Sequence, residues 1–213
     1  MKLMVASLVG MMALSGAAYA QPASDSTGFI EGVAQSAFGN VTSQSFGVEG
    51  GISITPAIDI VVDLGMVRDS SPKSLGTNAQ LVASGIGNVQ SGAVSYSVKQ
   101  PIGFGMVGVR YTIPRSDKLH PYVEVTGGMA RIKRDVRFTI GGTDVTDTLS
   151  KYGATLGTDL AGTESKAVFG GGVGVVYNIT PSFIFDAGYR FNRVASDPGT
   201  TVNRVGAGVG YRF

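Results

Sequence analysis

The nine residues from Val205 to Phe213 alternate strictly, with an apolar side chain at every odd position and glycine or Arg212 between them. A period of two places successive side chains on opposite faces of a β-strand. An apolar face that ends in aromatic residues is typical of a strand that crosses a lipid bilayer as part of a barrel. This pattern constrains the fold more than any other feature of the chain, because it fixes which side chains must meet acyl chains.

The same alternation recurs along the sequence in eight segments of about ten residues or more, the length that a tilted strand needs to cross a bilayer. An even number of strands is what a single-chain bacterial barrel requires, and eight is the smallest usual size. The predicted strands are Gly28–Phe38, Ser43–Thr55, Ile58–Arg68, Tyr96–Ile113, Pro121–Lys133, Lys166–Ile179, Phe183–Asn192 and Val202–Phe213.

The charged residues of these segments fall on the face opposite to the apolar set, as with Asp63 among Ile60, Val62 and Leu64. We therefore predict an all-β fold, an eight-stranded antiparallel up-and-down transmembrane β-barrel. A lipocalin-like soluble barrel would show the same alternation with its apolar rows inward, and the loop lengths favour the membrane alternative. The fourth segment is apolar on both parities, which a β-bulge near Met106 would reconcile.

The charged side chains would then project into a lumen that eight strands barely open, where they must pair. Arg110 and Glu124 flank one turn at equal distance on adjacent strands, so we expect an ion pair between them. Glu31 and Arg212 are expected to pair at the seam where the barrel closes. The complete predicted lumen network is Glu31, Glu49, Asp63, Arg110, Glu124, Asp186, Arg190 and Arg212.

Connections between the segments alternate between short turns and long polar loops, which would be periplasmic and extracellular respectively. The long loops are expected at residues 69–95 and 134–165 and a shorter one at 193–201, whereas the first, at 39–42, is unusually short. His120, the only histidine, falls in a predicted periplasmic turn. A basic group lies where the fifth strand should leave the outer leaflet, and it is a candidate contact for lipopolysaccharide phosphates: Arg131, Lys133, Arg134 and Arg137.

The amino-terminal residues have the features of a secretory signal peptide, with Lys2, an apolar stretch to Leu14 and an Ala18-Tyr19-Ala20 cleavage site. We expect residues 1–20 to be removed and residues 21–213 to form one barrel domain. No stretch offers the roughly eighteen consecutive apolar residues of a membrane-spanning helix, so a membrane-embedded chain must be a closed barrel. Without Lys2, 16 basic residues stand against 15 acidic ones, which gives no reason to invoke a nucleic-acid partner.

Four motifs resemble the family of small eight-stranded outer-membrane barrels that includes the transmembrane domain of outer-membrane protein A and the opacity-type surface antigens. They are Gly47–Gly51, Pro121–Val125, Phe185–Phe191 and Gly208–Phe213. The resemblance covers essentially the whole mature chain and implies a location in the bacterial outer membrane, among lipid and lipopolysaccharide. It also implies that Val209, Tyr211 and Phe213 form the terminal signal read by the barrel-insertion machinery.

These motifs specify architecture and hardly any activity, so three functions stay open. The first is a structural or surface-interaction role, adhesin-like or opacity-like, with an extracellular surface ligand and a lumen plugged by the charged network. The second is a narrow porin or a transporter of small hydrophobic solutes. The third is a lipid-modifying enzyme, which we do not expect because His120 is on the wrong side and no G-x-S-x-G elbow occurs. We predict no cofactor and no metal, since the chain lacks cysteine and the spacing of Asp144, Asp147 and Asp159 does not fit a calcium loop.

Overall fold

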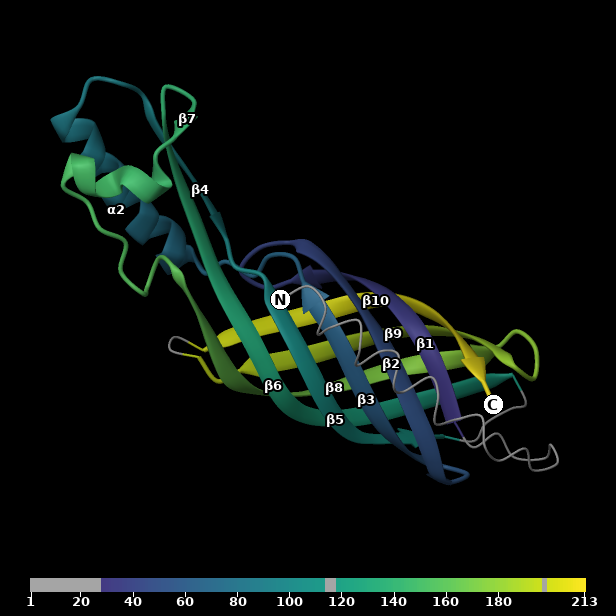
Figure 1. Ribbon diagram of the computed structural model, residues 1–213. Coiled ribbons are helices and arrows are strands. Elements are labelled where there is room, and N and C mark those ends of the chain that lie inside the picture. Colours follow the sequence, from purple (N-terminus) through teal and green to yellow (C-terminus); the bar gives the residue numbers. More distant parts are fainter. Residues whose placement is uncertain (1–27, 114–117, 197–198) are drawn as a thin grey trace.

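The computed structural model describes residues 28–113, 118–196 and 199–213 and contains a ring of eight antiparallel strands (Figure 1). Each strand of the ring pairs with the next along the chain, and the last pairs with the first. The predicted up-and-down barrel is therefore confirmed. The ring strands are β1 (Gly28–Phe38), β2 (Ser43–Thr55), β3 (Ile58–Val67), β5 (Ile102–Thr112), β6 (Leu119–Ile140), β8 (Gly162–Asn178), β9 (Phe183–Val194) and β10 (Thr200–Arg212).

The seam between β1 and β10 is closed along its whole length. Its register runs from Phe29 opposite Arg212 to Phe38 opposite Asn203. Beyond the Phe29–Arg212 end of this register, the backbones of Gly28 and Phe213 exchange two hydrogen bonds of 3.1 and 3.0 Å. Because every strand has two neighbours, the barrel has no open edge within its membrane-crossing part, as a bilayer requires.

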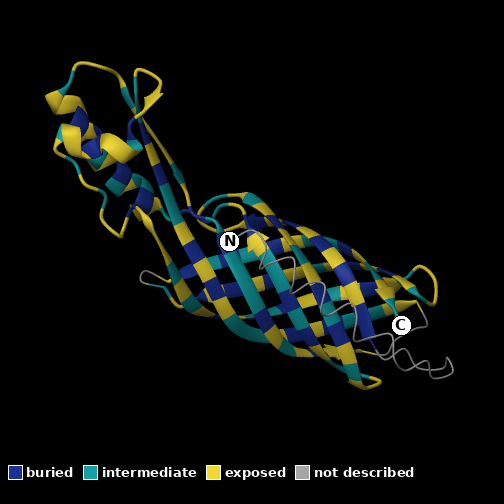
Figure 2. Ribbon diagram, viewed as in Figure 1, coloured by how far each residue is buried: buried dark blue, intermediate teal, exposed yellow. Residues whose placement is uncertain are grey.

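Burial alternates residue by residue along the strands, so that dark buried and light exposed positions form a chequered wall (Figure 2). On β10, Val202 and Arg204 are buried whereas Val205 and Val209 are exposed. Large apolar side chains such as Ile52, Val125 and Val209 lie more than 60 % exposed on the outside. This arrangement is stable only where lipid rather than water covers the outer face.

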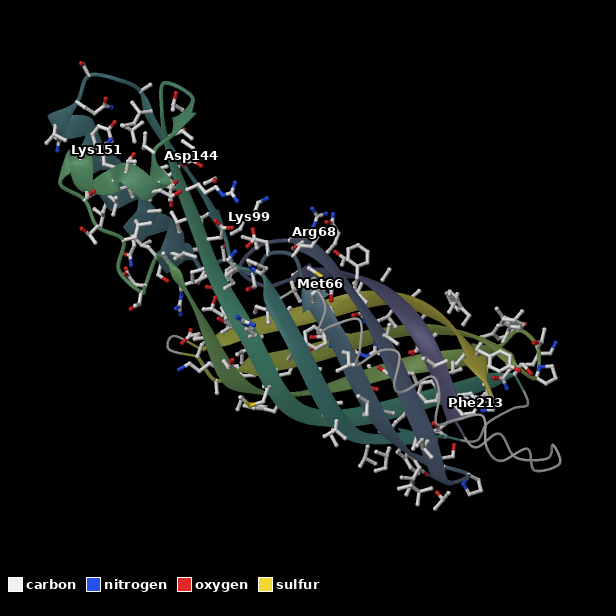
Figure 3. All side chains as sticks on the ribbon, in the orientation of Figure 1. Met66, Arg68, Lys99, Asp144, Lys151 and Phe213 are labelled. Carbon is white, nitrogen blue, oxygen red and sulfur yellow. The ribbon has the colours of Figure 1, made fainter. Side chains whose placement is uncertain are left out.

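At one end of the barrel, β6, which is 22 residues long, extends beyond the ring into a lobe that stands clear of it (Figure 1). The lobe also contains helix α2 (Lys73–Val89), strand β4 (Val94–Lys99), strand β7 (Thr143–Asp144) and the 3₁₀-helix η1 (Thr146–Tyr152). Asp144 and Lys151 lie in this lobe, whereas Phe213 lies at the opposite end of the barrel (Figure 3). The described connections at the Phe213 end, residues 56–57 and 179–182, are short, which is typical of the periplasmic end of such a barrel, so we expect the lobe on the extracellular side.

The lobe corrects the prediction of a polar loop over residues 69–95. In α2, Leu75, Ala79, Ala83 and Ile86 are buried at helical spacing. Three glycines, at 76, 85 and 87, dilute this pattern and lower the intrinsic helix propensity. The apolar stripe is stabilised by packing against β6 and η1 instead. No helix among residues 28–113, 118–196 and 199–213 is both long enough and apolar enough to cross a membrane.

The predicted fourth strand, Tyr96–Ile113, is two strands, β4 in the lobe and β5 in the barrel. The expected bulge near Met106 is wrong, since β5 keeps an unbroken register with both β3 and β6. Both of its faces are apolar because Ile102 and Met106 point into an apolar part of the lumen, while Val107 and Val109 face lipid. The sequence pattern indicates a bulge only if every inward residue is assumed to be small or polar.

The predicted fifth strand and the loop at 134–165 need the same kind of correction. β6 begins at Leu119 and runs to Ile140, beyond the expected end at Lys133. His120 therefore lies in a strand and not in a turn. The short connection at residues 39–42 is present as expected. The predicted signal peptide, residues 1–20, lies outside the described residues and stays a prediction.

Candidate functional site in the barrel lumen

The inward-facing side chains form three layers along the barrel axis. From the periplasmic end, β9 places Ile184, then Asp186 and Arg190, then Val194 towards the interior. The lower apolar layer contains Phe29, Val61, Tyr122, Val176 and Ile184. The upper apolar layer contains Ala37, Val67, Ile102, Met106, Ala130, Ile132, Val168, Val194 and Val202. Apolar side chains thus lie between the charged middle layer and each mouth of the barrel, although Arg110 also borders the cavity at the periplasmic mouth.

Two guanidinium groups and two carboxylates form a closed ring in the middle layer. Arg110 donates to Glu124 from Nε at 3.2 Å and from Nη2 at 2.8 Å, and it also donates to Glu49. Arg190 donates from Nε to Glu124 at 2.8 Å and from Nη2 to Glu49 at 2.6 Å. Each carboxylate therefore bridges both arginines, and the ring is electrically neutral. The predicted Arg110–Glu124 pair is formed as part of it.

A second neutral pair, Arg204 with Asp63, lies beside the ring. Arg204 donates to Asp63 at 3.0 Å and to the side-chain oxygens of Asn192 and Gln35 at 3.0 and 3.2 Å. Its guanidinium also stacks 4.4 Å from the centre of the Phe104 ring. Sequence reasoning missed Arg204, although its even number places it on the inward face of the last strand together with Arg212.

Two acids remain without a guanidinium of their own. Asp186 accepts hydrogen bonds of 2.9 and 3.1 Å from the Tyr122 hydroxyl. Glu31 is 2 % exposed, and neither of its carboxylate oxygens has a hydrogen-bond partner in the part of the chain that the structure describes. Glu31 also lies directly opposite Glu49 in the β1–β2 register. The middle layer therefore holds five carboxyl groups against three guanidinium groups, and Glu31 is the member with the fewest compensating contacts.

Oxygen atoms of Glu31, Glu49 and Asp186 lie within 4.8 Å of one another, a spacing that an oxygen-ligated metal ion would accept. The space between them is already taken by a cation. Nη2 of Arg190 is 3.8 Å from Glu31, 2.6 Å from Glu49 and 3.7 Å from Asp186. The cluster is therefore organised around a guanidinium group, and the structure gives no reason to place a metal there.

Aromatic rings and close packing complete the seal. The Arg110 guanidinium lies 3.9 Å from the centre of the Tyr122 ring and 5.1 Å from that of Phe29, so the lower apolar layer covers it. Beside Arg204, the void that reaches the upper layer measures about 10 Å³. That volume is close to the minimum needed for one water molecule.

The predicted pair between Glu31 and Arg212 is wrong. Arg212 lies opposite Phe29, two residues nearer the periplasm than Glu31, and its side chain donates to Asn178 at 3.1 Å. It is only half-buried and lines a cavity at the periplasmic mouth. The other seven predicted lumen residues are buried inside the ring. Parity gave the correct face for Arg212, but the stagger of the strands separated it from Glu31.

The four predicted lipopolysaccharide contacts do not share one face. Arg131, Lys133 and Arg137 are exposed on the outward face of β6, directly above the apolar band. Arg134 points to the other side, where it pairs with Glu164 and donates to the Thr158 carbonyl at 3.3 Å. Lys99 of β4 joins the outward face because it lies opposite Asp135. That residue comes from a different strand, so reading one segment at a time could not reveal it.

Residues 4–213 match the family described as the outer membrane protein beta-barrel domain. No curated protein matches the chain. Among solved structures, Neisserial surface protein A is 16 % identical, with 87 % of this chain and 96 % of that chain covered and a TM-score of 0.54. A major outer membrane protein from Thermus thermophilus is 11 % identical, covering 87 % and 99 %, with a TM-score of 0.52. Ail of Yersinia pestis is 15 % identical, covering 87 % and 97 %, with a TM-score of 0.49. At these identities the similarity concerns the fold alone.

Proposed function

The chain belongs to the outer membrane protein beta-barrel domain family, and from that premise we propose that it is a structural or surface-binding protein that acts outside a closed lumen. The observation that carries the proposal is the separation of the molecule into a sealed barrel and an ordered extracellular lobe. The barrel anchors the chain in the outer membrane. The lobe presents a surface to the outside.

The closed lumen supports this role over the narrow-porin and solute-transporter alternatives. A conducting path would have to cross two apolar layers and a neutral ring of ion pairs. Opening it would leave guanidinium or carboxylate groups unpaired in a low-dielectric interior, which is costly. The side chains of the lumen therefore serve best as a lock that holds the barrel rigid.

The lobe has an apolar core of its own, which makes it a preorganised surface and not a mobile loop. Phe138 and Ala79 are 0 % exposed, and Leu149 and Leu160 pack against them. The amino-terminal end of α2 has no side-chain cap. This end and the two-stranded ribbon of β4 and β6 remain accessible around the core. A rigid platform binds a partner with less loss of conformational entropy than a flexible loop would.

We also propose that the outward face of the ribbon contacts lipopolysaccharide phosphates, through Lys99, Arg131, Lys133 and Arg137. These residues lie immediately above the apolar band, at the level of the headgroups. Asp135 offsets only part of their charge, with distances of 3.9 Å to Lys133 and 3.4 Å to Arg137. Replacing Arg131, Lys133 and Arg137 by glutamine should reduce the lipopolysaccharide that co-purifies. Arg134→Gln is the matched control, and an equal loss there would contradict the assignment.

A catalytic role in lipid modification finds little support at this site. His120 lies near the periplasmic end, where Asn178 contacts its Nε2 at 2.9 Å, and is remote from the outer leaflet. We retain as a proposal that the outward row Val209, Tyr211 and Phe213 is read by the insertion machinery. Its side chains are exposed on the barrel wall, where such a partner could contact them.

The proposed role of the lobe can be tested by removing it at junctions that the fold provides. Ser70 and Gln100 are already joined by a backbone hydrogen bond of 3.0 Å, and Arg134 lies opposite Gly162. Residues 71–99 and 135–161 can therefore be replaced by short Gly-Ser linkers without disturbing the ring. The truncated barrel should still migrate as a folded, heat-modifiable species.

The readout is the adhesion of bacteria that display equal amounts of the parent protein or of the truncated barrel. Adhesion is measured on cultured epithelial cells and on an abiotic surface. We expect adhesion by the truncated barrel to fall to the level of cells carrying an empty vector. Undiminished adhesion by cells that display the lobeless barrel would refute a binding role for the lobe. The lumen variant Glu31→Gln serves as a control that leaves the lobe intact.

A further inference from the structure

We propose that the periplasmic mouth of the barrel is a binding site for the terminal carboxylate of a peptide, anchored by Arg212. This site lies at the opposite end of the barrel from the lobe and borders the charged network at Arg110. It would give the barrel a partner on the inner side of the membrane in addition to any partner outside.

The site is a cavity of about 380 Å³ at the end of the barrel where the turns are short. That volume lies in the range of small-ligand sites. Its floor is apolar and is formed by Phe29, Val176 and Ile184, which belong to the lower apolar layer of the lumen. Hydroxyl groups of Ser53, Thr55 and Thr112 occur on its walls. The cavity therefore combines an apolar base with a polar surround.

Arg212 supplies a positive charge that forms no ion pair among the described residues, and the Asp59 carboxylate acts on it only from across the cavity. Its Nη1 donates to the neutral Asn178 side chain at 3.1 Å, and no carboxylate lies within 4.0 Å of it among the described residues. The second guanidinium at the cavity, Arg110, is committed to Glu49 and Glu124. Asp59, the one acid among the described residues of the lining, accepts a hydrogen bond of 2.6 Å from Ser53.

Asn178 holds the guanidinium in place. Because its Oδ1 accepts from Arg212, its Nδ2 is the donor in the 2.9 Å contact with Nε2 of His120. The hydrogen-bonded series Arg212–Asn178–His120 thus runs from β10 through β8 to β6. It fixes the guanidinium group of Arg212 at the rim of the cavity. An arginine that is positioned but has no acidic partner is suited to recognise a carboxylate in a bidentate manner.

A peptide carboxyl terminus matches this lining better than an isolated anion does. Its carboxylate would meet Arg212, a small aliphatic side chain would cover the apolar floor, and its amide group would face the hydroxyls. Capture of a terminal carboxylate is an established mode of peptide recognition. Two periplasmic sources carry such a group, namely protein chains that end in an L-residue and cell-wall stem peptides that end in a D-residue.

The experiment is an NMR titration of the isotopically labelled mature chain in detergent micelles. The probes are N-acetyl-L-alanyl-L-alanine, N-acetyl-D-alanyl-D-alanine and the amide of each, which lacks the carboxylate. We expect saturable shifts confined to the residues that line the cavity at the periplasmic ends of the strands, with the amides bound at least about tenfold more weakly. The preferred stereoisomer identifies the source of the natural ligand.

Arg212→Gln should weaken binding of the acid by about tenfold or more and should leave binding of the amide unchanged. Arg193→Gln is the matched control, because Arg193 is an exposed arginine at the opposite mouth that also bonds a neutral side chain, Thr201, at 2.8 Å. Thr112→Trp, which places a bulky side chain in the cavity and leaves the Arg212 residue unchanged, provides a second test if Arg212→Gln fails to assemble. Absence of saturable shifts with every probe, or equal affinity for acid and amide, overturns the proposal.

Discussion

The sharpest test of the lumen compares two buried glutamates that lie directly opposite each other. Glu31 and Glu49 face the same interior from β1 and β2, and they are 2 % and 1 % exposed. Glu49 accepts hydrogen bonds from Arg110 and Arg190, whereas neither oxygen of Glu31 accepts a hydrogen bond from any described residue. The substitutions Glu31→Gln and Glu49→Gln therefore remove the same charge at nearly the same place but break very different contacts.

The structure sets the expected magnitudes. Glu49→Gln opens the four-membered ring and removes the carboxylate that bridges Arg110 and Arg190, and removal of one partner of a buried pair typically costs about 3–5 kcal/mol. Glu31→Gln breaks no hydrogen bond among the described residues, gives up only a long 3.8 Å contact with Arg190, and relieves a like-charge contact across two strands. Such contacts destabilise a sheet by up to about 1 kcal/mol, so the variant should be neutral or slightly more stable than the parent.

The assay is equilibrium urea unfolding of the barrel in phospholipid vesicles, followed by far-ultraviolet circular dichroism and by tyrosine fluorescence, since the chain has no tryptophan. Unchanged denaturant slopes would show that the two variants expose the same surface on unfolding. If Glu31→Gln destabilises the barrel as much as Glu49→Gln does, the ring is not the source of the stability and the reasoning fails.

Three further predictions concern the rest of the molecule. Arg204→Met should cost about 3–5 kcal/mol in the same urea assay, because it leaves Asp63 buried without its cation. Phe138→Ala should cost the lobe about 3–5 kcal/mol, so that trypsin cleaves the lobe while the barrel stays intact on gels. The hydrogen bonds from Thr146 hold the pKa of the Asp144 carboxyl below its ordinary value of 3.8. The turn at Asp144 is thus unaffected from neutral pH down to that value and loosens only as the pH falls further, and Thr146→Val should move the carboxyl's NMR titration upwards.

Much of the barrel follows from the sequence because lipid and lumen impose opposite chemistry on alternate residues. Asp186 and Arg190 could be placed inside from parity alone, and the Arg110–Glu124 pair from their symmetry about a turn. Parity gives the face of a side chain but not its height. For that reason it placed Arg212 correctly inward and still failed to exclude Glu31 as its partner.

The features that could not be predicted from the sequence lie where apolar side chains do not simply face outward and polar side chains do not simply face inward. Ile102 and Met106 form part of an apolar lid inside the lumen, so the inward row of β5 looks like a second lipid face. The sequence predicts loops in place of the lobe because α2 is rich in glycine and depends on contacts with Phe138 and Leu149, far along the chain. Such contacts are set by tertiary packing and leave no local periodic signal of comparable strength.

The central claim is that hydrocarbon layers and ion pairs close the lumen, so that the protein acts through its outer surfaces. Single-channel recording of the purified barrel in planar bilayers tests it most directly. The account predicts a silent baseline for the parent protein and for Glu31→Gln at moderate voltages. Discrete, stable conductance steps from the parent protein, with an amplitude altered by Arg190→Met, would contradict it.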